Sequence, residues 1–284
     1  SDLDVSLLTF VPFTFVVLSR LGANVRRSLL IPVVCMQTIA ANLGSMLTPI
    51  GNPQNLYLYG KSGMSIGGFV LLMLPYTLVS LLLLLAWAAL VCRKASAALS
   101  VDELVSSSAS QGDQRIILLY LVLFAVCLLS VIRVLPYGIA FAAVLVCALF
   151  ADPRTLRTVD YSLLLTFVAF FIFIGNLGRI PAFSGWLQEF LTGREVLVAV
   201  LASQVTSNVP AALLLSGFTA ETQALIIGTN LGGLGTLIAS MASLISYRQI
   251  ARELPQGKKQ YFGLFTLSNL IFLALLLGVW FLLR

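Results

Sequence analysis

Two polar, helix-breaking stretches interrupt apolar segments of the chain and hold residue types suited to binding a small ion or solute. The first reads NLGSMLTPIGNPQN from Asn42 to Asn55, and the second reads GTNLGGLGTLIAS from Gly228 to Ser240. Carboxamides, hydroxyls and backbone carbonyls freed by a break bind ions and solutes through hydrogen bonds and dipoles. Non-helical backbone at membrane depth is tolerated only where it is buried in protein or lines a watery cavity. We therefore interpret both stretches as broken membrane helices at a binding site.

Neutral polar side chains at these breaks, and at a third one further along the chain, are the candidate ligands. They are Asn42, Thr48, Asn52 and Asn55 in the first stretch, Ser207 and Asn208 in the third, and Asn230 and Thr236 in the second. The alternative is that the asparagines only cap the helix ends that the breaks create.

Prolines and glycines shape the same stretches. Pro49 and Pro53 each lack a backbone N–H and clash with the preceding turn, so no simple helix runs through them. The glycines are expected to permit unusual backbone angles and close approach rather than to touch solute. They are Gly44, Gly51, Gly232, Gly233 and Gly235.

Acidic residues at the start of the chain add a titratable candidate. A carboxylate at membrane depth costs ~3 kcal/mol or more, so Asp4 and, less strongly, Asp2 are functional candidates by default. Asp4 suits proton carriage if it is desolvated and Na⁺ binding if it is ionised. We place the candidate Na⁺ site near Asp4, Asn55, Asn208 and Thr236. The alternative is that both acids lie in a water-exposed chain start.

Composition indicates the solvent in which these residues work. Of 284 residues, 59% are hydrophobic and 10% are charged, with mean hydropathy +1.01, whereas globular domains carry about 25% charged residues. An all-α polytopic membrane protein follows. The 17 Lys and Arg are scattered between apolar runs, which indicates topology signals and no nucleic-acid partner. The absence of histidine argues against an intramembrane enzyme, and no cofactor is expected beyond a coupling Na⁺ or H⁺. We expect Cys35, Cys92, Cys127 and Cys147 to be free, buried thiols.

Apolar runs of about 20 residues, the length that crosses a bilayer, predict the elements that hold the site. Such spans are expected at 66–92, 115–132, 136–151, 160–178 and 260–283. The stretch 194–217 has two short apolar arms around Ser207-Asn208-Val209-Pro210, which favours a re-entrant hairpin with a polar tip. Residues 1–18 read as the tip and returning arm of another hairpin.

An internal repeat relates these features. Seven residues of the first half recur 188 positions later: Asn42, Leu43, Gly44, Thr48, Ile50, Leu56 and Tyr59 match Asn230, Leu231, Gly232, Thr236, Ile238, Leu244 and Tyr247. Placing loop 20–27 in the cytoplasm leaves only Lys61, Arg133, Arg179, Arg194 and Arg284 of the 17 Lys and Arg on the other side, which makes the repeats inverted. We expect a first repeat over 1–92 that is N-terminally incomplete, a cytoplasmic linker over 93–114, and a second repeat over 115–284.

The run Asn42–Asn55, continued by Leu56-Tyr57-Leu58-Tyr59-Gly60-Lys61-Ser62-Gly63, resembles the ion transporter superfamily. This superfamily holds arsenite permeases, sodium/proton antiporters and citrate or dicarboxylate carriers, and the chain is most similar to uncharacterised bacterial inner-membrane anion permeases. Ser203–Pro210 resembles their second hairpin tip, whereas Leu3 stands where the first tip usually has asparagine. The resemblance implies a multi-pass protein of the bacterial inner membrane, elevator-like movement and a homodimer.

Together these features predict a secondary active transporter that moves a small anion, either a carboxylate or an inorganic oxyanion, coupled to Na⁺ or H⁺ by symport or antiport. No basic residue lies inside the two broken stretches, so an anion relies on dipoles, amides and co-bound cations. Efflux of a neutral arsenite-like solute and Na⁺/H⁺ antiport fit nearly as well and stay open as alternatives.

Overall fold

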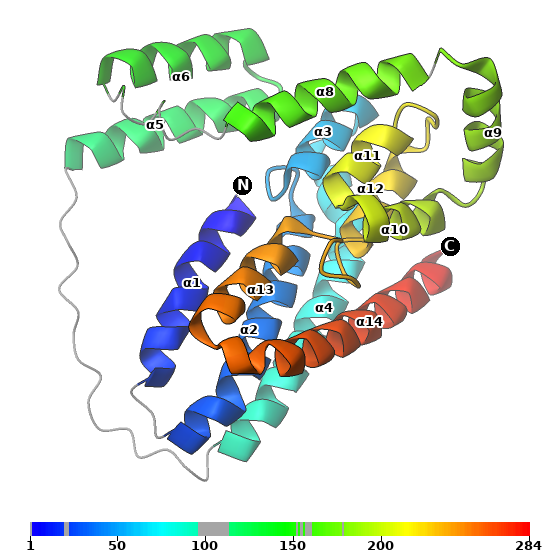
Figure 1. Cartoon of the computed structure of the whole chain (residues 1–284). Helices are drawn as coiled ribbons and strands as arrows, with labels where there is room; N and C mark the ends of the chain where they lie inside the picture. Colours follow the sequence, from blue (N-terminus) through cyan, green and yellow to red (C-terminus); the bar gives the residue numbers. More distant parts are fainter. Residues whose placement is uncertain are drawn as a thin grey trace. The chain divides into compact units, whose positions relative to one another are not determined.

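The computed structural model of this chain describes residues 2–19, 23–95, 114–151, 153, 156, 161–177 and 179–284. Within these ranges the secondary structure is helical, with no strand (Figure 1). The helices before the central gap are α1 (Asp2–Ser19), α2 (Ala23–Gly44), the short η1 (Ser45–Leu47), α3 (Pro53–Ser62) and α4 (Ile66–Ala95). After it come α5 (Gln114–Val131), α6 (Tyr137–Ala151), α8 (Tyr161–Leu177), α9 (Pro181–Leu191), α10 (Glu195–Thr206), α11 (Asn208–Leu215), α12 (Thr222–Leu231), α13 (Met241–Glu253), η3 (Pro255–Gly257) and α14 (Lys258–Leu283).

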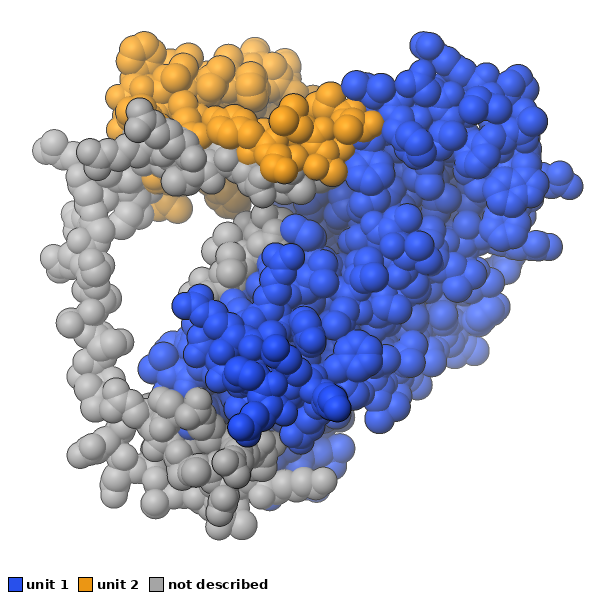
Figure 2. Space-filling view, in the orientation of Figure 1, with its two compact units in different colours: residues 1–99, 170–284 blue, residues 100–169 orange. Residues whose placement is uncertain are grey.

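The chain divides into two compact units (Figure 2). Unit 1 comprises Ser1–Leu99 and Phe170–Arg284, and unit 2 comprises Ser100–Ala169. In unit 2, α5 and α6 pack against each other, and most of their large apolar side chains are exposed. Unit 1 contains both predicted helix breaks. The cytoplasmic linker predicted over 93–114 falls largely outside the described residues.

Three helices in the described part of the chain are long and apolar enough to cross a membrane. They cover Leu29–Leu47, Ile66–Arg93 and Pro255–Leu283, while α5 and α6 are shorter apolar helices. Outward-facing leucines such as Leu71, Leu82 and Leu85 of α4 are exposed, as expected for side chains that face hydrocarbon. The outer faces of α4 and α5 also carry Cys92 and Cys127.

The cysteine prediction is correct in one respect and wrong in another. All four thiols are free, and Cys35 is buried. Cys92 and Cys127 are exposed, because an apolar helix that faces lipid does not need to bury its thiols in protein. An apolar sequence around a cysteine therefore does not show that its thiol is buried in protein, because lipid-facing helices are apolar too.

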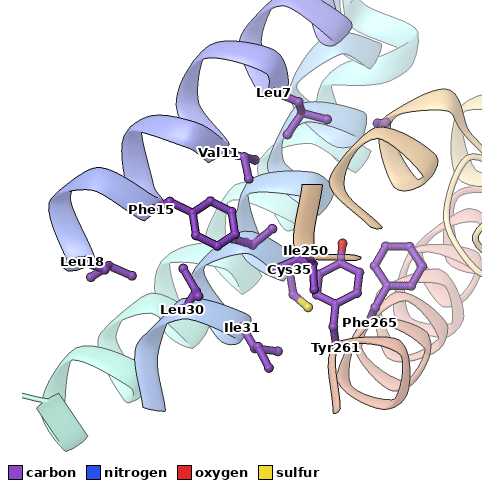
Figure 3. Close-up of a cluster of buried hydrophobic side chains, with 12 residues drawn as sticks. Leu7, Val11, Phe15, Leu18, Leu30, Ile31, Cys35, Ile250, Tyr261 and Phe265 are labelled. Carbon is purple, nitrogen blue, oxygen red and sulfur yellow. The ribbon is translucent and has the colours of Figure 1, made fainter. Parts of the chain in front are cut away.

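The apolar core of unit 1 is built on an α1–α2 helix pair (Figure 3). Leu7, Val11, Phe15 and Leu18 of α1 repeat at intervals of three and four residues, so they form one stripe along the helix. This stripe packs with a matching one on α2 (Leu30, Ile31, Val34 and Cys35) and with Ala242, Ile250, Tyr261 and Phe265 of α13 and α14. The core thus fixes α2 against α13, the two half-helices that flank the breaks on this side.

Both predicted helix breaks are present. The first leaves the α-helical path after Gly44, passes through η1 and resumes at Pro53, and the second leaves it after Leu231 and resumes at Met241. The arms predicted over 194–217 are two short helices, α10 and α11, that meet at Ser207. The helix α9 was not predicted, because its 11 residues are too few for the span-length criterion.

Candidate functional site

Asn230, near the end of α12, joins the two helix breaks. Its Nδ2 donates to Asn55 Oδ1 at 2.6 Å and to Ile226 O at 2.7 Å, and its Oδ1 accepts a hydrogen bond from Asn52 Nδ2 at 3.3 Å. All three asparagines are buried. Buried carboxamides need partners to offset their desolvation, so these bonds hold α3 to α12 where the two breaks begin and end.

Asn42 makes the reciprocal crossing from the first break to the second. Its Nδ2 donates to Ser240 Oγ at 3.0 Å and to Gly233 O at 3.4 Å. Asn42 and Asn230 are the paired positions of the internal repeat, and each of them contacts the break of the opposite half. The helix packing follows the same pattern, because α2 packs against α13 and α12 packs against α3.

Ser45 organises the first break from within. Its hydroxyl accepts from Asn52 Nδ2 at 3.0 Å and donates to Asn42 O at 2.9 Å. Asn55 Nδ2 lies 3.5 Å from Ser45 O and 3.4 Å from Thr48 O. Three of the predicted ligands of the first stretch therefore share one serine, which the sequence analysis did not single out.

Gln204 of α10 holds the second break. Its Nε2 donates to Gly232 O and Leu234 O, each at 3.0 Å, and to Val200 O at 3.1 Å. Its Oε1 accepts from Thr236 N at 2.9 Å. A single side chain thus bonds backbone groups of Gly232, Leu234 and Thr236, which fixes residues 232–236 to the α10–α11 hairpin.

The turn between α10 and α11 is also tied to the second break. Ser207 has φ 75° and ψ 154°, a region of backbone conformation that is essentially restricted to glycine and costs of order 1–3 kcal/mol elsewhere. Asn208 N donates to Ala239 O at 3.0 Å, and Ser207 Oγ lies 3.4 Å from the same oxygen. Strain of this kind persists where surrounding contacts over-determine it, and such places are often functional.

The N-termini of α3 and α11 converge on residues 230–233. Asn52 and Asn55 at the start of α3 contact Asn230, and a Cβ built on Gly233 would lie 3.1 Å from Asn208 Nδ2 at the start of α11. Helix N-termini carry partial positive charge, so their convergence suits an anionic group.

The far ends of α3 and α11 meet as well. Tyr57 OH lies 2.9 Å from Ser216 Oγ, and Lys61 Nζ donates to Ser216 O. The two helices therefore run side by side in the same direction, next to α12 (Figure 1). The only lysine of α3 sits at the end away from the helix N-termini, so it does not contribute to the site.

Some predicted ligands lie outside this cluster. Thr48 contributes its carbonyl, not its hydroxyl, to the Asn55 contact. Thr236 is exposed, and its hydroxyl donates to Gln204 O at 3.1 Å. Asp4 falls in the first turns of α1, but its side chain is outside the described part of the chain. The structure thus brings together Asn42, Asn52, Asn55 and Asn230, with Asn208 beside them.

The glycines and prolines of the two breaks are accommodated for different structural reasons. A Cβ on Gly51 would overlap the Ser45 carbonyl oxygen, and Gly235 has φ +108° with the Gln204 carboxamide against it. Gly232 packs on Ser203. Gly44, in contrast, has helical angles (φ −69°, ψ −36°), and a Cβ there would meet nothing within 4 Å, so neither expected reason applies to it.

Pro53 is the first residue of α3, where a missing N–H is tolerated, and Pro49 lies buried within the break.

Three residues that matter to the geometry were not among the predicted ligands: Ser45, Gln54 and Gln204. Gln54 is almost completely buried, and neither of its side-chain polar atoms has a hydrogen-bond partner in the described part of the chain. The signal that could have identified Gln204 is a carboxamide in the otherwise apolar arm of the predicted hairpin. The sequence gives no signal that separates Gln54 from the neighbouring Asn52 and Asn55.

Comparison with known proteins fixes the family. The profile described as "Citrate transporter" matches residues 1–225. The chain belongs to the citrate transporter family. This membership agrees with the resemblance to ion transporter superfamily anion permeases, and families of this kind are transporters rather than enzymes.

Two curated proteins are similar in sequence to this chain. Inner membrane protein YbiR of Escherichia coli (strain K12) is 35% identical over 253 residues, which cover 86% of this chain and 64% of that protein. "Uncharacterized transporter MJ0456" of Methanocaldococcus jannaschii is 31% identical over 245 residues, which cover 86% of this chain and 65% of that protein. The chain thus spans just under two thirds of the length of each relative.

Proposed function

We propose that this family member is a secondary active transporter of the bacterial inner membrane that moves a small anion, coupled to Na⁺ or H⁺. The observation that carries the proposal is the buried carboxamide cluster in which Asn230 contacts Asn52 and Asn55. It joins two helix breaks that are far apart in sequence, at the point where two helix N-termini converge. Matched broken helices of this kind are where transporters bind substrate and coupling ion.

An anion is the solute class that this geometry favours. The N-termini of α3 and α11 supply partial positive charge, and neither broken stretch contains Lys or Arg. A multivalent anion therefore needs a co-bound cation, for which break carbonyls and the oxygens near Asn55 and Asn208 are the candidate ligands. A family described as "Citrate transporter" makes carboxylates the first anions to test, ahead of inorganic oxyanions.

Inverted repeats and an elevator-type movement complete the proposal. The reciprocal contacts of Asn42 and Asn230 support a two-fold relation between the halves. Gln204 fixes the α10–α11 hairpin to the second break, which supports movement of hairpin and broken helix as one body. On this proposal α10 and α11 form a re-entrant hairpin, and the full carrier acts as a homodimer.

The test is uptake by the full-length carrier in proteoliposomes, with labelled citrate, succinate, sulfate and phosphate, each in a Na⁺ and in a choline gradient. We expect saturable, Na⁺- or H⁺-dependent uptake and counterflow of one anion class, both lost in Asn55→Ala and retained in Asn269→Ala. Asn269 is a matched control, because it is a buried asparagine of α14 outside the site. Exchange of Na⁺ for H⁺ with no anion movement would overturn the proposal in favour of antiport, and Asp4 would then be the residue to vary.

A further inference from the structure

Gln54 is a buried side chain whose hydrogen-bonding capacity is entirely unused within the described part of the chain. It is 1% exposed, and both Nε2 and Oε1 lack a partner there. Leaving one buried donor or acceptor unpaired is destabilising, and a whole unpaired carboxamide is more so. Such a group calls for a partner beyond the described residues.

Gln54 lies beside the candidate site along the chain. It is the second residue of α3, next to Asn55, and shares the buried face of that helix with Asn55 and Leu58. Asn52 is the N-cap residue of α3 but makes no capping bond. Its Nδ2 donates to Ser45 and Asn230. Its Oδ1 is also buried without a partner.

The helix start therefore offers a defined set of free groups. An α-helix leaves its first N–H groups without intrahelical partners, and the Asn52 side chain does not cap those of α3. The backbone N–H groups and Gln54 Nε2 are donors, whereas Gln54 Oε1 and Asn52 Oδ1 are acceptors. A ligand that fits this set must accept several hydrogen bonds and donate at least one.

We propose that Gln54 contacts the transported solute and selects solutes that carry an O–H group beside their anionic oxygens. The anionic oxygens accept from Nε2 and the helix N–H groups, and the O–H donates to Oε1. This inference rests on the proposed function and names the chemical groups of the solute that the same site binds. A bare cation would use the oxygens but leave Nε2 unpaired, and an anion with acceptors only would leave Oε1 unpaired.

Two kinds of solute share this chemistry: a hydroxycarboxylate, and an inorganic oxyanion that keeps one proton near neutral pH. Each has a partner of similar shape that lacks the O–H. Malate is paired with succinate, and phosphate is paired with sulfate. The two pairs separate the organic from the inorganic source while testing the same hydrogen bond.

The experiment measures binding and uptake of these four anions by the full-length carrier and by Gln54→Leu, Gln54→Met and Gln54→Glu. We expect the wild type to prefer the O–H member of one pair by about tenfold or more. In Gln54→Leu and Gln54→Met we expect that ratio to fall to near one. In Gln54→Glu, the carboxylate repels the bound anion and the Nε2 donor is lost, so binding of every anion should weaken.

Thermal unfolding without solute separates ligand contact from a structural role. Replacing an unpaired buried carboxamide by an apolar side chain of similar size should leave the unfolding midpoint unchanged or raised. The matched control is Gln249→Leu on α13, where the carboxamide also has an unpaired buried Oε1 but lies outside the site. It should leave the anion ratio unchanged.

Three outcomes overturn the inference, and they are distinguishable. If the wild type moves an anion but its O–H preference survives in both Gln54→Leu and Gln54→Met, Gln54 does not read the solute and the proposed function still stands. If these variants instead unfold at lower temperature with an unchanged ratio, Gln54 has a structural role. If the wild type binds no anion at all, the inference fails together with the proposed function.

Discussion

The two helix breaks use their polar groups in opposite ways. At the second break, the Gln204 carboxamide makes four hydrogen bonds to Val200, Gly232, Leu234 and Thr236. At the first break, three buried side-chain atoms of Asn52 and Gln54 have no partner in the described residues. Among the described residues, no buried side-chain nitrogen or oxygen of the second break lacks a partner, whereas these three of the first break do.

This difference assigns different tasks to the two segments that the sequence pairs in its predicted repeat. A loop that Gln204 holds through three backbone groups can transmit movement between α10 and α12. A helix start with unmatched donors and acceptors is pre-organised for a ligand that completes them. Asn230 is the point where the two tasks meet, because it belongs to the second break and contacts Asn52 and Asn55 of the first.

Asn230→Ala is expected to have the largest effect, because it removes the hydrogen bonds that link the second break to the first. Asn52 Nδ2 loses its bond to Asn230, and Asn55 Oδ1 loses its short one. Asn52 Nδ2 keeps its bond to Ser45 Oγ, so one Asn52 N–H and Asn55 Oδ1 are left unpaired, at a cost of about 2–6 kcal/mol in total. Solute affinity should fall by about 100-fold or more, measured by isothermal titration and by proteoliposome uptake.

Asn269→Ala controls for the loss of any buried asparagine. Asn269 is fully buried and bonds Phe265 O at 2.8 Å, but it lies on α14 away from the breaks. It should lower stability and leave solute affinity within about twofold of wild type. Equal losses of affinity in the two variants would mean that the Asn230 cluster has no special part in binding.

Gln204→Glu tests the rigid side of the comparison. The carboxylate keeps an acceptor for Thr236 N but turns oxygen toward three backbone carbonyls, which should lower the free energy of unfolding by about 3 kcal/mol. Hydrogen exchange of the amides in 232–239 should accelerate, while Gln188→Glu on the exposed face of α9 should change neither. Unchanged exchange in Gln204→Glu would show that the loop is rigid for another reason.

The sequence predicted the elements of this molecule well where a local rule applied. Pro49 and Pro53 in Asn42–Asn55 lack a backbone N–H and disfavour a helix interior. The chain is accordingly non-helical at Pro49, and a new helix begins at Pro53. The pairing of Asn42 with Asn230 through the repeat identified two residues that the structure places in one hydrogen-bonded region. The long apolar runs likewise identified α4 and α14, because hydrophobic length depends only on the chain itself.

The sequence did not predict how polar groups are partnered, because that depends on contacts between distant segments. In the sequence, Gln204 looks like any other glutamine in an apolar arm. Only the position of loop 232–236 in the structure shows which groups its carboxamide bonds. Gln54 is likewise defined by the partners that it lacks. Thr236 was chosen by its match to Thr48, yet its hydroxyl bonds Gln204 and faces outward, because residues related by a repeat need not share an environment.

Gly51→Ala and Gly44→Ala test whether close approach shapes the first break. A methyl group on Gly51 would overlap the Ser45 carbonyl oxygen, so the break must shift, at about 1–3 kcal/mol. Gly44 is helical with open space around its Cα, so alanine there should stabilise by about 0.5–1 kcal/mol. Unfolding midpoints of the two variants should therefore move in opposite directions, and a shared direction would show that the Gly51 contact relaxes freely.

Ser207→Gly should have the smallest effect and sharpens the comparison at the hairpin turn. Glycine adopts the φ 75°, ψ 154° conformation of this residue without steric cost, so its strain of order 1–3 kcal/mol should be relieved. The lost hydroxyl contact to Ala239 O is long, at 3.4 Å, and offsets only part of this gain. We expect a net stabilisation of about 1 kcal/mol in thermal unfolding, with transport slower because the turn is no longer held to one conformation. Ser207→Ala separates the two terms, since it removes the hydroxyl and keeps the strain: it should be slightly less stable than wild type, and equal stability of the alanine and glycine variants would show that the turn stores no strain.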